Sequence, residues 1–129
     1  MTISFNTEQI LIGGQWRNTE NNRTLDLNNP STGELLCKIG RGSAKDIDDA
    51  VKAAQAALDG EWGKMTATQR GRVLTKIGEK ILENVDELTR LESLDVGKPT
   101  TQARNDAIAM ARYMEFYGGA ADKVMGHTI

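Results

Sequence analysis

Three side chains in this sequence could take part in chemistry: the carboxylate of Asp95, the thiol of Cys37 and the imidazole of His127. Carboxylate oxygens suit hard cations, a deprotonated thiol is a nucleophile, and an imidazole can transfer protons or bind metals. Each role also needs a defined position and suitable neighbours. The elements that hold the three residues therefore decide which roles are open to them.

Asp95 lies near the end of a predicted helix. The apolar stripe of this helix consists of Leu88, Leu91 and Leu94. Gly97 can adopt the left-handed conformation that follows a helix end, and Pro99 cannot continue the helix. Because the stripe reaches nearly to this end, we expect Asp95 to be held close to the core boundary on a rigid corner.

The other two candidates have no suitable neighbours. Cys37 lies in a predicted strand among apolar residues, without a cation or helix N-terminus to lower its pKa, so a buried, inert thiol is expected. His127 has no partner nearby in the sequence and is expected to be a surface histidine. One cysteine and one histidine also exclude an internal disulfide and a nitrogen–sulfur metal cluster.

Composition favours one globular domain among these 129 residues, of which 39% are hydrophobic. The net charge of -2 and the lack of a basic cluster argue against nucleic-acid or membrane-surface partners. No apolar run approaches the length of about 18 residues that a spanning helix needs. The first residues lack the pattern of a secretory signal, so the cytoplasm is the expected location.

The first third of the chain predicts two β-hairpins within residues 10–42, after an N-terminal arm at residues 1–9. Gly13-Gly14 separates two short strands. Thr24–Asn28 alternates polar and apolar residues, and the turn Asn29-Pro30-Ser31-Thr32-Gly33 leads into a further strand. Asp46, Asp48 and Asp49 then complement the dipole of a helix at residues 44–58, which Ser43 and Asp46 cap.

The apolar stripe of this helix consists of Ile47, Ala50, Val51, Ala54, Ala57 and Leu58. Trp62 and Met65 are expected to fill the gap before the next helix, which Thr66 and Gln69 cap. That helix should turn Val73, Leu74, Ile77 and Ile81 inward. Asn84 can end it and, with Glu87, cap a helix to Leu94, although one kinked helix remains an alternative.

Thr100 or Thr101 should cap the final helix. Its expected inner stripe is Ala103, Ala107, Met110, Met114, Tyr117, Ala121 and Val124. Gly118-Gly119 interrupts this stripe, which indicates that another backbone packs closely there or that the helix bends. Residues 126–129 resemble the start of a strand. The fold class is therefore mainly α with two N-terminal β-hairpins, with residues 43–125 as its helical part.

Several segments, in this order along the chain, resemble the N-terminal part of the NAD(P)-dependent aldehyde dehydrogenase superfamily. They are Leu11-Ile12-Gly13-Gly14-Gln15-Trp16, Asn29-Pro30-Ser31-Thr32-Gly33-Glu34, the helix at residues 46–58, Trp62-Gly63-Lys64-Met65, Arg70-Gly71-Arg72, Leu91-Glu92-Ser93-Leu94-Asp95-Val96-Gly97-Lys98-Pro99 and Tyr117-Gly118-Gly119-Ala120-Ala121-Asp122-Lys123. The pattern is most similar to betaine-aldehyde-like and general aldehyde dehydrogenases. The resemblance extends from about residue 10 to residue 129.

This resemblance implies an α/β fold with a Rossmann-like cofactor domain, of which residues 43–125 would be a helical part. It implies oxidation of an aldehyde to a carboxylic acid with NAD or NADP, through thiolate attack, hydride transfer and thioester hydrolysis. The family's nucleophilic cysteine, glutamate base and cofactor residues have no matching positions here. We therefore expect an inactive N-terminal segment that docks on the rest of a homo-oligomeric enzyme, with residues 126–129 starting the lead-in to its oligomerisation arm.

The resemblance also implies two candidate sites. Many relatives bind a structural Na⁺ or K⁺ ion, and the matching positions are the carbonyls of Leu27 and Asn28 and the carboxylate of Asp95. The alternative role for Asp95 is to accept backbone hydrogen bonds at the corner. Ile108, Ala109 and Arg112 match the mouth of the family's aldehyde tunnel; core packing for Ile108 and a solvated Arg112 are the alternative.

A rival hypothesis needs no enzyme. In it, the chain is a self-contained helical module that binds a protein partner through the face formed by Met110, Met114 and Tyr117.

Overall fold

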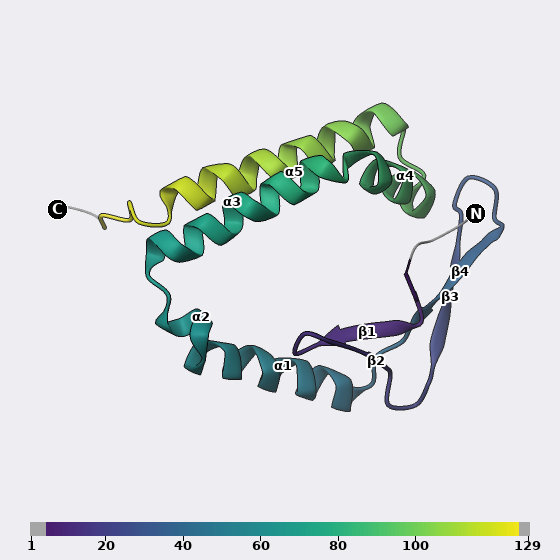
Figure 1. Ribbon diagram of the computed structural model, residues 1–129. Helices are drawn as coiled ribbons and strands as arrows, with labels where there is room; N and C mark the ends of the chain where they lie inside the picture. Colours follow the sequence, from purple (N-terminus) through teal and green to yellow (C-terminus); the bar gives the residue numbers. More distant parts are fainter. Residues whose placement is uncertain (1–4, 127–129) are drawn as a thin grey trace. The chain divides into compact units, whose positions relative to one another are not determined.

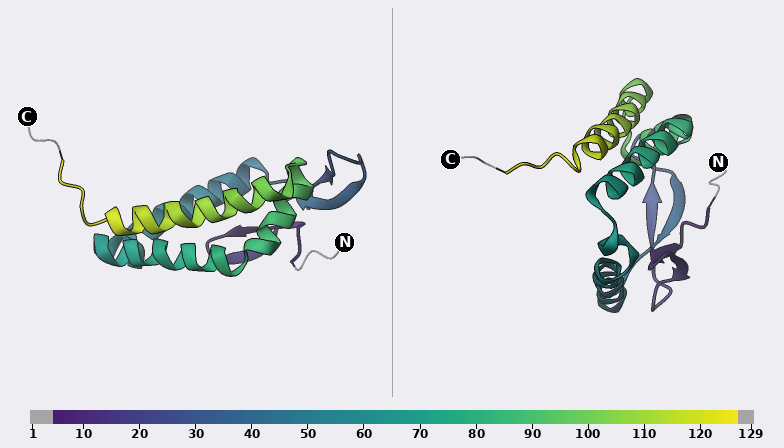
Figure 2. Two further views of the ribbon diagram at one scale, coloured as in Figure 1. Left: turned by 90° about the horizontal axis from the view of Figure 1, so that it is seen from above. Right: turned by 60° about the vertical axis from the view of Figure 1, so that its left-hand side comes forward.

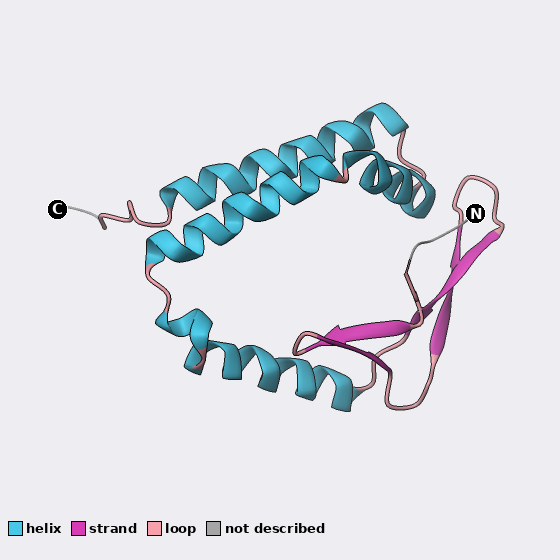
Figure 3. Ribbon diagram, viewed as in Figure 1, coloured by secondary structure: helices cyan, strands magenta, loops and turns pink. Residues whose placement is uncertain are grey.

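A computed structural model describes residues 5–126, which contain two small antiparallel sheets and five helices. In chain order the elements of Figures 1 and 3 are β1 (Gln9–Ile12), β2 (Gln15–Asn18), β3 (Thr24–Asn28), β4 (Leu35–Gly40), α1 (Ala44–Asp59), α2 (Glu61–Lys64), α3 (Ala67–Glu83), α4 (Val85–Val96) and α5 (Thr100–Ala120). The chain divides between Gly63 and Lys64 into two compact units. The predicted class, two N-terminal hairpins followed by helices, is confirmed.

Both predicted hairpins are present. Gly13 and Gly14 connect β1 to β2 with φ angles of 60° and 78°, and positive φ at both central residues is what a tight two-residue turn of this kind requires. In the second turn the amide of Gly33 donates to the carbonyl of Asn29 at 2.7 Å, and the side chain of Asn29 accepts from the amide of Ser31. The β3–β4 register shifts after Leu27, which marks a bulge.

The helix of the first unit begins as predicted but faces another way. Ser43 and Asp46 form the expected capping box. The predicted apolar stripe is exposed at Ile47, Val51 and Leu58, and Trp62 on α2 is also exposed rather than filling a gap. The side of α1 near the hairpin carries small and acidic residues instead. Asp46 on this side binds Arg17 of the hairpin, and Ala53 lies close to Gly13.

In the second unit, α3 and α4 are two helices and not one. The capping box of Thr66 and Gln69 starts α3 as predicted. Asn84 ends α3 by donating its amide to Ile81 and its side-chain Nδ2 to the carbonyl of Lys80, at 2.8 Å. Asn84 occupies the N-cap position of α4 as predicted, but its side chain is bound to the preceding helix and makes no capping bond to α4, so only the predicted side-chain cap is wrong.

The corner between α4 and α5 has the predicted left-handed glycine. Gly97 has a φ of 71° and donates to the carbonyl of Ser93. Lys98 then joins the two helices, since its ammonium binds Glu92 on α4 and Asp106 on α5. No threonine side chain caps α5; Pro99 occupies the N-cap position, so the predicted role of Thr100 or Thr101 is wrong.

Helices α3 and α5 pack through small residues. Ala103, Ala107 and Ala111 of α5 are buried, as are Gly71, Gly78 and Ile81 of α3. The two helices lie side by side in all three views of Figures 1 and 2. A Cβ atom on Gly71 would lie only 2.2 Å from the carbonyl oxygen of Gly118, so a second backbone approaches Gly118 as the sequence predicted.

This close approach changes which residues of α5 and α3 are buried. Met110, Tyr117 and Val124 were expected on the inner stripe and are exposed, whereas Met114 and Ala121 are half-buried. On α3, Ile81 is buried but Ile77 is exposed. Large side chains would separate the backbones, so alanine and glycine occupy the contact.

Two adjacent glycines of α5 provide a matched test of this packing. Gly118→Ala places a Cβ 2.7 Å from both the carbonyl oxygen of Gly71 and the hydroxyl of Thr75, whereas a Cβ on Gly119 meets nothing within 4 Å. We expect Gly118→Ala to lower the free energy of unfolding by about 1–3 kcal/mol through steric overlap. Gly119→Ala should be neutral or stabilising by up to about 1 kcal/mol. Urea denaturation measures both, and equal effects would contradict this packing.

Candidate functional site

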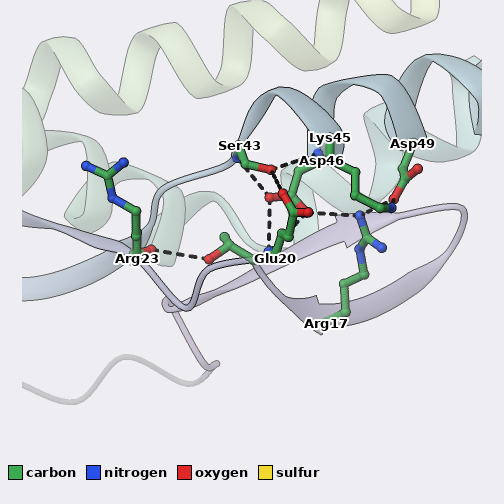
Figure 4. A network of polar contacts seen from close by, with 8 residues as sticks. Arg17, Glu20, Arg23, Ser43, Lys45, Asp46 and Asp49 are labelled. Carbon is green, nitrogen blue, oxygen red and sulfur yellow. Dashed lines mark hydrogen bonds and ion pairs between the residues drawn. The ribbon is translucent and has the colours of Figure 1, made fainter.

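A network of charged groups in the first unit joins α1 to the β1–β2 hairpin (Figure 4). The guanidinium Nη2 of Arg17, on β2, lies 3.0 Å from Asp46 Oδ1 and 3.0 Å from Asp49 Oδ2. Asp46 is only 3% exposed and also accepts hydrogen bonds from the backbone amides of Ser43 and Glu20. Buried carboxylates need such partners, and this one has three donors.

The network lowers the pKa of both carboxyl groups. The pKa of Asp46 lies below its ordinary value mainly because the backbone amide of Ser43 donates to it. Desolvation opposes this shift, and smaller contributions from the amide of Glu20, the side chain of Ser43 and the charge of Arg17 add to the lowering. The pKa of Asp49 is lowered first by its hydrogen bond from Lys45 and then by Arg17. The same bond raises the pKa of Lys45, whose Nζ lies 2.7 Å from Asp49.

The role of this network is structural, since it holds α1 against the β1–β2 hairpin. Asp46 and Asp49 are both ionised near neutral pH and are occupied by protein donors, so neither is poised to accept a proton from a substrate. The acidic residues were predicted to complement the helix dipole, and Asp46 to cap the helix with Ser43, whereas their pairing with Arg17 was not predicted. No local signal could have revealed it, because Arg17 and Asp46 are 29 positions apart.

The residues proposed for a monovalent ion belong to different units. The carbonyls of Leu27 and Asn28 lie at the β3 bulge, opposite Cys37 and Leu35. Asp95 lies in the last turn of α4 and is exposed, so its expected position near the core boundary is wrong. Thr89 is buried on this helix, whereas Leu88, the first of the predicted stripe, is exposed.

Oxygen donors of this kind suit a hard cation, and the exposed carboxylate of Asp95 is accessible to one. Among residues 5–126, no cluster of three or more histidine, cysteine, aspartate or glutamate side chains could hold a metal. A site made of two backbone carbonyls and one carboxylate is not such a cluster, so the ion site stays a prediction.

Two of the three predicted tunnel residues line one hollow on the outer side of α5. Ala109 and Arg112 line it together with three aromatic residues, Tyr113, Phe116 and Tyr117. Ile108 is half-buried and is not part of this lining. Arg112 donates to Glu115 at 2.7 Å, so its charge is paired. Tyr113 and Phe116 were not predicted to line it, although their spacing from Ala109 is helical.

The other candidate side chains offer little chemistry. Cys37 is a half-buried free thiol on β4, where it pairs with Leu27. His127 lies outside the described residues, as does all but the first residue of the strand start predicted at residues 126–129. That first residue, Gly126, is not in a strand and has a φ of 69°. Within the described part of the chain, no helix has the length and apolar character needed to cross a membrane.

Comparison with known proteins defines the family. The profile of the aldehyde dehydrogenase family matches residues 16–129, and the chain therefore belongs to this family. It is 38% identical over 130 residues to the mitochondrial aldehyde dehydrogenase family 2 member B4 of Arabidopsis thaliana, with 99% of this chain and 24% of that protein covered.

Solved structures agree with this assignment. A variant of an aldehyde dehydrogenase from Bacillus cereus matches with a TM-score of 0.90 and 33% identity, over 96% of this chain and 26% of that chain. A betaine aldehyde dehydrogenase variant from Staphylococcus aureus, solved in complex with NAD⁺, matches with a TM-score of 0.87 and 34% identity, over 95% and 25%. The fold is that of the N-terminal part of aldehyde dehydrogenases, and the chain spans about a quarter of the length of these relatives.

The Arg17–Asp46 network predicts acid-sensitive stability. The pKa of Asp46 is lowered in the folded state, so its ionised form adds to the free energy of unfolding. This contribution is complete at neutral pH and is lost as the pH falls below about 4, because the carboxylate then becomes protonated. Asp46→Asn should lower the melting temperature at pH 7. The further decrease in melting temperature from neutral to acidic pH should then be smaller in this variant than in the unsubstituted chain. Of the three acidic residues expected to complement the dipole, only Asp46 lies in the first turn of α1. The exposed Asp48 therefore supplies the control, since Asp48→Asn should change neither quantity. Thermal unfolding monitored across this pH range checks both; parallel profiles for Asp46→Asn and the unsubstituted chain would refute the assignment.

Proposed function

We propose that this chain is the N-terminal portion of an NAD(P)-dependent aldehyde dehydrogenase that oxidises an aldehyde to a carboxylic acid. The observation that carries the proposal is the match of residues 16–129 to the family, supported by the agreement of the fold with much longer aldehyde dehydrogenase chains. Among these neighbours, the Staphylococcus aureus enzyme is described in complex with NAD⁺. The cofactor proposed for the complete protein is accordingly NAD or NADP.

In this proposal the 129-residue chain has no turnover of its own. The reaction needs an activated cysteine thiolate to attack the aldehyde and a base to assist hydrolysis of the resulting thioester. Cys37 is held in a β-ladder opposite Leu27, and within residues 5–126 no lysine or arginine is hydrogen-bonded to its thiol. The remainder of the polypeptide would supply the nucleophile, the base and the cofactor site.

The contribution of this chain to substrate binding would come from α5. Ala109 and Arg112 are proposed to line the entrance of the aldehyde channel, with Ile108 packing beneath it. The open hollow at Ala109 is lined mainly by aromatic carbon, a surface that favours apolar groups. Arg112 is paired with Glu115 and would border the entrance without adding net charge.

The proposal includes three further elements. The complete protein is a homo-oligomer of the cytoplasm, and it holds a structural K⁺ or Na⁺ ion through Leu27, Asn28 and Asp95.

For the ion, we expect K⁺ or Na⁺ to raise the melting temperature of the complete protein and Asp95→Asn to abolish this effect; an equal response in the Asp95→Asn variant would exclude Asp95 as a ligand.

Activity assays test the central claim directly. The complete protein should produce NADH or NADPH in the presence of an aldehyde, whereas the pure 129-residue chain at the same concentration should produce neither, because it lacks the nucleophile. The measurement is cofactor absorbance with NAD⁺ and NADP⁺ tested separately and a panel of aliphatic, aromatic and betaine aldehydes. Turnover by the isolated chain, or none by the complete protein with any of these aldehydes, would refute the proposal.

A substitution at Ala109 tests the channel. In the complete protein, Ala109→Trp should narrow the entrance and lower kcat/KM for bulky aldehydes by about tenfold or more, with a smaller effect on short ones. Ala56→Trp is the matched control, since Ala56 is also an exposed helical alanine but lies on α1. An equal loss of kcat/KM for short and bulky aldehydes would place Ala109 outside the channel.

A further inference from the structure

Lys98, in the corner between α4 and α5, holds the two helices together with a single ammonium group. Its Nζ binds Glu92 on α4 and lies 2.6 Å from Asp106 Oδ2 on α5. Only 24% of the Lys98 side chain is exposed, so water and salt screen these two ion pairs less than pairs on the open surface. The hydrogen bonds to Asp106 and Glu92 raise the pKa of Lys98, which is therefore charged at neutral pH.

Asp106 belongs to the side of α5 that carries the hollow. Residues three, four and seven positions apart lie on the same side of a helix. Ala109 follows Asp106 by three positions and Tyr113 follows it by seven, and both of these residues line the hollow. The ion pair with Lys98 therefore holds α5 one helical turn before the hollow begins.

A second ion pair between the same helices provides a comparison. Arg104 on α5 binds Asp86 on α4, and these two side chains are 49% and 86% exposed. Ala109 follows Arg104 by five positions, which places the two residues about 140° apart around the helix axis. This pair connects the helices too, but it acts on a different side of α5 from the hollow.

We propose that Lys98 is a positioning residue for the aldehyde: by holding Asp106 to the α4 corner, it fixes the part of α5 that borders the entrance and so limits the size of aldehyde admitted. This inference rests on the proposed function, in which Ala109 lines that entrance. Lys98 does not touch the substrate and acts through Asp106. The start of α5 has no side-chain cap, so contacts with other residues must hold it in place.

The alternative role for Lys98 is to offset the helix dipole at the C-terminal end of α4. That role needs a positive charge beyond Gly97 and does not need Asp106. Asp106→Asn separates the two roles, because it removes one charged partner of Lys98 and leaves the ammonium at the end of α4. Asp106 is an exposed helical residue, and asparagine has a similar helix propensity, so the variant should fold.

Steady-state kinetics of the complete protein tests the proposal. The ratio of kcat/KM values for short and bulky aldehydes measures the discrimination by size. Lys98→Met and Asp106→Asn should each reduce this discrimination about threefold or more, mainly through KM, with kcat changed less than about twofold. Lys98→Arg keeps the charge and should retain most of the discrimination, while Arg104→Met, the matched control, should leave it unchanged.

Three kinetic results would overturn the proposal. They are unchanged discrimination in Asp106→Asn, an equal loss in Arg104→Met, and an unsubstituted protein that does not discriminate by size. If Lys98→Met fails to fold, Asp106→Asn decides the outcome.

Hydrogen exchange of the same variants reports on α5 without an activity assay. The backbone amides of residues 106–110 should exchange several-fold faster in Asp106→Asn than in the unsubstituted protein, and no faster in Arg104→Met. If this pattern appears and no aldehyde is oxidised, the proposed function fails while Lys98 still anchors α5. If aldehydes are oxidised and Asp106→Asn changes neither exchange nor size discrimination, the positioning role fails and the function stands.

Discussion

The contact between Gly71 and Gly118 brings the backbones of α3 and α5 closer than side chains would allow, and the second unit is arranged around it. A Cβ atom on either glycine would overlap the carbonyl oxygen of the other. With the helices this close, only alanine, glycine and the sides of larger residues fit between them. The bulky residues of α5 are therefore turned to other sides of the helix, which leaves Tyr113, Phe116 and Tyr117 exposed.

The first unit depends on charge rather than on apolar packing. Arg17 binds both Asp46 and Asp49, while the amides of Ser43 and Glu20 complete the bonds of Asp46. This orients α1 with its acidic side toward the hairpin and leaves Ile47 and Val51 exposed. Burying a carboxylate is favourable here because each of its oxygens has donors, including an arginine.

Membership of the aldehyde dehydrogenase family gives these exposed surfaces a common explanation. The chain spans about a quarter of its relatives' length, so surfaces that are apolar here can be interior surfaces in a longer protein. Tyr113, Phe116 and Tyr117 line one hollow together with Arg112.

Local sequence signals determined much of this fold. The glycine turn at Gly13-Gly14, the capping boxes after Ser43 and Thr66, and the left-handed Gly97 were all predicted and confirmed, because each depends on residues within a few positions of one another. The family resemblance came from the same local segments. The approach of a backbone to Gly118 was also predictable, since a glycine within a helix costs stability unless space is needed.

Only the tertiary structure decided which faces are buried and which charges pair. Periodicity placed Met110 and Tyr117 inside, but the helix separation set by Gly71 and Gly118 selected the alanine face. Arg17 and Asp46 are far apart in sequence, and Asn84 could have capped either of two helices. These outcomes depend on contacts between distant segments, where several apolar or polar faces satisfy the same local pattern and only the three-dimensional packing distinguishes them.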